Sequence, residues 1–184
     1  MDDTETSVDV IAPNLPVEGA IVRANAPDWV DQDDVRVIGY PKFVFEYDIT
    51  LERAFLSDRT VIQSVTVDAV TGGRLRNDTY PDVESRTIPK EALVQPRFQR
   101  EGAIEKAKSA IRRYISFHYP TSVLVRSLPD MEISREDFAF TLYWLVPMGS
   151  GPDSETVTIV DAVTGEAIEE DVRLENVTAE TVAN

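Results

Sequence analysis

The chain has no cysteine, and this absence removes several kinds of chemistry at once. Disulfides, thiolate metal sites and cysteine nucleophiles are excluded, whereas the redox compartment is left open. There is a single histidine, His118, at the expected end of a helix, where a partly charged imidazole favours a capping role. A Ser-His-Asp catalytic triad would have to use this residue. We therefore predict no catalytic residues and no enzyme activity.

Lysine is scarce as well, with four residues against fourteen arginines. The chain of 184 residues has 33 acidic and 18 basic residues, for a net charge of −15 at pH 7. In molar salt the Debye length falls to about 3 Å, so a dense carboxylate surface becomes tolerable. An acidic, lysine-poor composition is typical of haloarchaeal proteins, and we predict a halophilic protein. An ordinary acidic protein is the alternative.

Long apolar runs are also missing. No run approaches the roughly 18 residues that a membrane-spanning helix needs. Residues 1–5 are acidic and lack the basic and apolar regions of a signal peptide. We expect no membrane span and a high-salt cytoplasm for the chain as it stands. An extracellular or virion-associated location is expected if the chain belongs to a larger assembly.

The clearest feature that is present is an internal repeat. The segment Val-Asp-Ala-Val-Thr-Gly occurs unchanged at residues 67–72 and 160–165. Its aspartate can accept hydrogen bonds from the backbone ahead, and its glycine can adopt the positive φ that closes a hairpin. A second match, Glu-Gly-Ala-Ile, occurs at residues 18–21 and 101–104, in the same order. We interpret the pair of matches as an internal duplication.

Hydrophobic periodicity places the main elements. Residues 43–51 alternate apolar and polar side chains as a half-buried strand does, and residues 138–146 repeat this pattern. A helix is predicted over residues 100–117, where apolar residues recur at three- and four-residue steps. An earlier helix must stop before Pro27. The strand before the second turn changes parity, which predicts either burial on both faces or a bulge.

These observations divide the chain into five segments. They are an acidic N-terminal arm (1–13), a first α+β repeat (14–80), a proline-containing linker (81–97), a second α+β repeat (98–174) and an acidic C-terminal tail (175–184).

The chain resembles PepSY-type repeats and the wider cystatin-like group. The resemblance is carried by residues 47–51 with 65–72, and by residues 138–146 with 159–165. It implies an α+β fold of two pseudo-duplicated cystatin-like units, each a helix packed on an antiparallel β-sheet. Two aromatic stripes are then expected beneath the helices: Phe43, Phe45 and Tyr47, and Phe138, Phe140 and Trp144. Domains of this kind are usually non-catalytic and bind or inhibit partner proteins.

The carboxylates do not predict a metal site. Asp28, Asp31, Asp33 and Asp34 offer oxygen ligands, but they lack the spacing and the mid-loop glycine of an EF-hand. Such a cluster is expected background among 33 acidic residues. Asp68 and Asp161 are explained by their turns rather than as a pair of catalytic acids. No metal or cofactor is predicted.

The basic residues are concentrated in one region. Residues 86–126 hold nine basic and three acidic residues. Lys106, Lys108, Arg112 and Arg113 lie on the polar side of the long helix, and we predict that they form a partner-contact face. A nucleic acid would need such a stripe, but the surrounding negative charge argues against one as the partner. A protein partner, or a second copy of the chain, is expected instead.

The leading functional hypothesis is a non-enzymatic protein-interaction module, an accessory or regulatory subunit in a halophile. The alternative is a structural component of a larger assembly, such as a haloarchaeal virus particle or a surface structure. Exposed edge strands would supply docking sites in either case.

Overall fold

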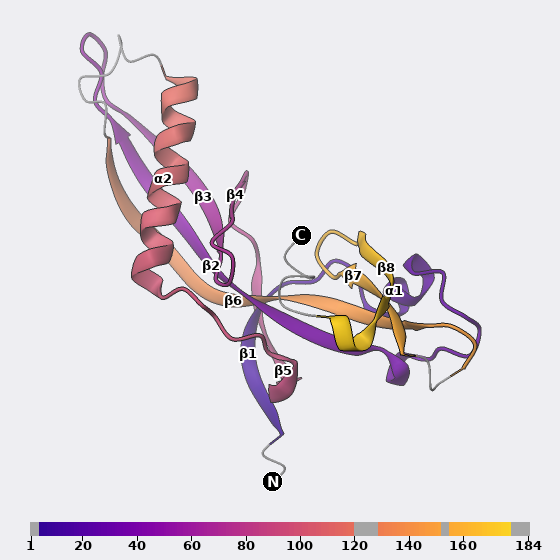
Figure 1. Cartoon of the computed structure of the whole chain (residues 1–184). Coiled ribbons are helices and arrows are strands. Elements are labelled where there is room, and N and C mark those ends of the chain that lie inside the picture. The colour runs from indigo at the N-terminus through magenta and orange to yellow at the C-terminus, as the bar shows by residue number, and fades with distance from the viewer. Residues whose placement is uncertain (1–3, 120–128, 152–154, 178–184) are drawn as a thin grey trace. The chain divides into compact units, whose positions relative to one another are not determined.

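The computed structural model describes residues 4–119, 129–151 and 155–177. Its strands form one mixed eight-stranded sheet in the order β4-β3-β2-β6-β1-β5, with β7 paired to β6 and β8 paired to β7. The elements are β1 (Glu5–Ile11), α1 (Val17–Arg23), β2 (Arg36–Leu51), β3 (Arg59–Asp68), β4 (Arg74–Asn77), β5 (Val83–Pro89), α2 (Arg100–His118), β6 (Asp130–Met148), β7 (Thr156–Asp161) and β8 (Ala167–Arg173) (Figure 1).

This architecture corrects the expected fold class. The prediction of two cystatin-like units, each a helix packed on its own sheet, is wrong, because one large mixed sheet dominates the fold. β2 runs through Gly39 and Pro41 as a single strand of 16 residues. Proline lacks the N–H that a ladder needs. Pro41 lies outside the ladder of β2 with β3, which begins at the next residue, Lys42, opposite Asp68.

The chain forms two compact units, each assembled from separate segments. We call residues 42–81 and 96–138 the middle unit, and residues 1–41, 82–95 and 139–184 the terminal unit. Neither matches the expected repeats at 14–80 and 98–174. The expected N-terminal arm contains β1, and the expected linker contains β5. These two strands pair with each other, from Glu5 opposite Pro89 to Ile11 opposite Val83, and local sequence patterns do not reveal such a long-range pairing.

In the middle unit, α2 covers the hairpin formed by β2 and β3 (Figure 1). Four residues at four-residue spacing share one helix face and are buried: Ala103, Ala107, Ile111 and Ile115. They pack on Phe45, Tyr47, Ile49, Leu51, Val65 and Val67. The first aromatic stripe therefore lies beneath a helix, but this helix is α2, from the second expected repeat, and not the helix of the stripe's own repeat.

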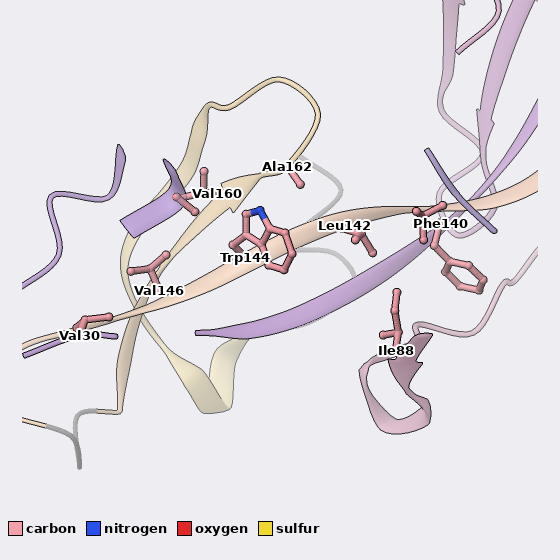
Figure 2. Close-up of a cluster of buried hydrophobic side chains, with 10 residues drawn as sticks. Val30, Ile88, Phe140, Leu142, Trp144, Val146, Val160 and Ala162 are labelled. Carbon is pink, nitrogen blue, oxygen red and sulfur yellow. The ribbon is translucent and has the colours of Figure 1, made fainter. Parts of the chain in front are cut away.

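In the terminal unit, the core lies around the second half of β6 (Figure 2). Trp144 packs with Leu142, Val146 and Val160, and its indole Nε1 donates a hydrogen bond to the carbonyl of Leu15 at 3.0 Å, just before α1. Phe138 departs from the expected stripe, because its ring lies against Phe43 in the middle unit, at 4.9 Å between centroids.

The strand β7 accounts for the change of parity seen in the sequence. Val157, Thr158, Ile159 and Val160 are all buried, so the strand is covered on both faces. The register between β7 and β8 also shifts on either side of Ile159. Both alternatives offered by the sequence, burial on two sides and a bulge, occur here.

The longer helix lies with the longer hairpin, and in each unit the helix and the hairpin come from different halves of the chain. The hairpin of β2 and β3 has ten paired positions and is covered by the 19-residue α2. The hairpin of β6 and β7 has six paired positions, and the seven-residue α1 belongs to the same unit. At about 1.5 Å per helical residue and about 3.3 Å per strand residue, the long helix spans most of the long hairpin.

Candidate functional site

The two copies of the repeated segment form the same turn. In the first copy, Oδ1 of Asp68 accepts hydrogen bonds from the backbone N–H groups of Val70 and Thr71, at 2.8 and 2.7 Å. In the second copy, Oδ1 of Asp161 accepts from Val163 and Thr164, at 2.6 and 2.9 Å. Both aspartates are turn formers, as the sequence predicts.

Each turn also accepts hydrogen bonds from residues that lie just before a helix. The carbonyl of Ala69 accepts hydrogen bonds from the N–H groups of Arg97 and Phe98, at 2.8 and 2.9 Å, just before α2. The carbonyl of Ala162 accepts from Asn14 and Leu15, both at 2.9 Å, just before α1. A turn from one half of the chain therefore positions a helix from the other half.

The glycines that close the turns provide a matched test. Gly72 and Gly165 have φ values of 74° and 73°, so alanine at either position costs about 1–2 kcal/mol in the left-handed region. A Cβ on Gly72 would also lie 2.6 Å from Cε of Lys106, whereas at Gly165 the nearest atom is 3.9 Å away. We expect Gly72→Ala to lower the urea midpoint more than Gly165→Ala does. Adding Lys106→Ala to Gly72→Ala should remove the difference.

Only the first turn contains an ion pair among the residues that the structure describes. Nζ of Lys42 lies 2.9 Å from Oδ2 of Asp68, and the two side chains are 16% and 8% exposed. In the second turn, the residue opposite Asp161 is Tyr143. Burial by itself raises the pKa of Asp68. The hydrogen bonds from Lys42 and from the N–H groups of Thr71 and Val70 outweigh it, so the pKa lies below its ordinary value.

The four basic residues predicted as one face of α2 lie on two sides of the helix. At about 100° per residue, Arg113 is only about 20° around the axis from Lys106, whereas Lys108 is about 160° from it. Lys106 lies beside the turn at Gly72, and its Nζ is 4.6 Å from the centroid of the Phe98 ring. Lys106 and Arg113 therefore face the side of the helix on which the first turn lies.

The strand β4 adds two arginines on this side. Arg74 donates a hydrogen bond from Nη1 to Oγ of Ser109 at 3.3 Å. The guanidinium of Arg76 lies over the ring of Tyr114, 4.5 Å from its centroid, a cation–π contact that orients the side chain against the helix. Arg76 also pairs with Asp78 at 3.4 Å, but Asp78 is 92% exposed, so this pair is weakly held.

We call Arg74, Arg76, Lys106 and Arg113 the basic edge. In the part of the chain that the structure describes, β4 pairs only with β3, so its other side is open. Leu75, between the two arginines, is 65% exposed. The helix periodicity identifies Lys106 and Arg113, whereas no site is predicted at residues 74–76. The signal that points to them is the Arg-Leu-Arg alternation directly after a turn.

The other candidate residues make local structural contacts. Nδ1 of His118 lies 2.9 Å from the carbonyl oxygen of Tyr114, and the two rings stack at 4.1 Å. The N–H of Asp31 donates to Oδ2 of Asp34 at 2.9 Å in a capping box of a short 3₁₀ turn. Among residues 4–119, 129–151 and 155–177, no group of three acidic or histidine side chains is arranged to hold a metal. In the same residues, no helix is long and apolar enough to cross a membrane.

Comparison with family models, curated proteins and solved structures found no match to this chain. The resemblance to PepSY-type repeats therefore stays a prediction.

Proposed function

We propose that the chain is a non-enzymatic protein-interaction module, an accessory or regulatory subunit of a halophile, and that its basic edge binds an acidic segment of a partner protein. The observation that carries this proposal is an open strand edge flanked by four cationic side chains in a chain of net charge −15. The composition supports the halophilic cytoplasm as its place of action.

The charge of the basic edge favours an acidic partner. In the molar salt of the proposed cytoplasm, charges act over only about 3 Å, so the positive surface selects an acidic segment and its orientation at contact rather than from a distance. The cation–π contacts of Arg76 and Lys106 restrain both side chains before binding, which lowers the entropy that docking must remove.

The backbone of β4 favours an extended segment. An open strand edge presents N–H and C=O groups that an added strand can pair with, while pockets and charges select its side chains. Arg74 and Arg76 point to one face of β4, and the exposed Leu75 points to the other. A partner strand that alternates acidic and apolar residues satisfies both faces.

The test uses a fluorescently labelled peptide of alternating glutamate and isoleucine, titrated with the full chain in 0.1 M salt. We expect Arg74→Gln/Arg76→Gln to weaken binding about 2- to 30-fold, since exposed ion pairs contribute roughly 0.2–1 kcal/mol each. Lys108→Gln/Arg112→Gln makes the same charge change on the other side of α2 and should leave the affinity nearly unchanged.

Two outcomes would contradict the proposal. Equal loss of affinity in both double variants would mean that only net charge matters. Tighter binding of a DNA duplex than of the peptide, with a steep dependence on salt, would assign the edge to phosphate contacts instead.

A further inference from the structure

The strand that follows the second turn carries the opposite charge to the strand that follows the first. Arg74, Leu75 and Arg76 begin β4, and the corresponding residues 93 positions later are Ala167, Ile168 and Glu169 in β8. β8 continues with Glu170 and Asp171. We call Glu169, Glu170 and Asp171 the acidic edge.

The acidic edge is also open. β8 pairs with β7 and, within the described chain, with no other strand. Glu170 and Asp171 are exposed, and Glu169 is half-buried. None of the three carboxylates forms an ion pair or a side-chain hydrogen bond with the residues that the structure describes, in contrast to Glu136, which Arg100 holds with two bonds at 2.8 and 2.6 Å.

Both edges are built against pairing with themselves. β4 has only four residues, two of them arginines. β8 is interrupted where its register with β7 shifts, and Asp171 has a φ of 54°. Short strands and bulges limit backbone pairing of any kind, whereas like charges oppose only the pairing of an edge with another edge of the same sign. Two β4 edges would bring arginines together, and two β8 edges would bring carboxylates together, so only β4 against β8 is complementary.

We propose that the acidic partner is a second copy of this chain, and that the basic edge of one copy binds the acidic edge of the next. The inference rests on the proposed function of the basic edge. Each contact uses one basic and one acidic edge. A head-to-tail contact of this type closes into a ring of two or more copies or continues as an open filament. The chain would then act as a repeating component of an assembly.

The test is sedimentation of the full chain over a roughly hundredfold range of concentration, in 0.1 M and 1 M salt. We expect the mass of the wild type to exceed the 20.6 kDa of the monomer as concentration rises. The increase should be smaller in 1 M salt, where the Debye length falls from about 10 Å to about 3 Å.

Two variants, each of which removes charges from one edge, distinguish the roles of the two edges. Arg74→Gln/Arg76→Gln keeps only the acidic edge, and Glu169→Gln/Glu170→Gln keeps only the basic edge. Each alone should sediment as a monomer, and an equimolar mixture should form a heterodimer and nothing larger. Lys108→Gln/Arg112→Gln should assemble as the wild type does. Circular dichroism and thermal unfolding of each variant establish that it is folded.

The ways in which the two proposals can fail are distinguishable. A wild type that stays monomeric in 0.1 M salt overturns the self-association. Normal assembly of Glu169→Gln/Glu170→Gln overturns it as well. If Arg74→Gln/Arg76→Gln still loses affinity for the glutamate-isoleucine peptide in either case, the basic edge remains a docking site for another acidic protein. If that affinity is also unchanged, both proposals fall.

Discussion

Replacing Asp68 by alanine is expected to destabilise the fold by about 3–5 kcal/mol, whereas Asp161→Ala is expected to cost only about 1–2 kcal/mol. Both substitutions remove an acceptor for two backbone N–H groups of the turn. Only Asp68→Ala also removes the carboxylate 2.9 Å from the mostly buried ammonium of Lys42. Removing one partner of a buried ion pair lowers the free energy of unfolding more than removing one partner of a surface ion pair does. Urea unfolding of both variants measures the difference.

The effect of Asp68→Ala should depend on pH in a defined direction. The folded state lowers the pKa of Asp68 from its ordinary 3.8. A lowered carboxyl pKa adds stability that is complete above the ordinary value and is lost as the pH falls through the lower pKa of the folded state. The difference between wild type and variant should therefore be constant near neutral pH and shrink below about pH 4.

The variant Lys42→Met supplies the control for the ion pair. It keeps an apolar stem of similar length but removes the ammonium, so it should raise the pKa of Asp68 toward the value that burial alone favours. If Asp68→Ala and Asp161→Ala proved equally destabilising at pH 7, the ion pair with Lys42 would contribute nothing measurable.

The features that the sequence predicts well depend on neighbouring residues. The turns follow from Asp68 and Asp161 accepting hydrogen bonds two and three residues ahead, and from a glycine at positive φ. The long helix, predicted over 100–117, spans Arg100–His118, because its apolar spacing is regular from Ala103 to Ile115. Interactions over a few residues leave a pattern that a single sequence displays.

The features that the sequence predicts poorly depend on the pairing of strands that lie far apart in the chain. Nothing local in residues 5–11 distinguishes a loose acidic arm from a strand, and β1 forms because β5 lies beside it. Half of the basic edge escapes prediction for the same reason. Arg74 and Arg76 become important only because β4 is the last strand of the sheet on its side and α2 packs next to it.

The spacing of the repeats contains a signal that only the strand registers resolve. The helix starts are 83 residues apart and the turns 93 apart. The strand registers align Phe43, opposite Val67, with Trp144, opposite Val160, which are 101 residues apart. The second half therefore gains residues between its helix start and its strand, and loses residues in its hairpin. Each half alone combines a helix and a hairpin of unequal length.

Because its helix and hairpin differ in length, each half should need the other half in order to fold. A chain divided between Pro81 and Asp82 should give two fragments, neither of which folds alone. Fragment 1–81 has the long hairpin of β2 and β3 but lacks α2, and so exposes Phe45, Tyr47 and Ile49. Fragment 82–184 has Trp144 and Val160 but lacks α1 and β1. Each buried side chain of this size contributes about 1.5–3 kcal/mol, and a whole domain has only about 5–15 kcal/mol of net stability.

Mixing the two fragments in equal amounts should restore the fold, because each unit then regains the segments that it draws from the other half. Circular dichroism and a cooperative thermal transition would report the recovery. The uncut chain with a protease site inserted between residues 81 and 82 is the control, since it carries the same insertion without the cut. A first fragment that unfolds cooperatively on its own would show that the hairpin of β2 and β3 does not require the helix from the second half. The exchange of helices between the two halves would then not be needed for stability.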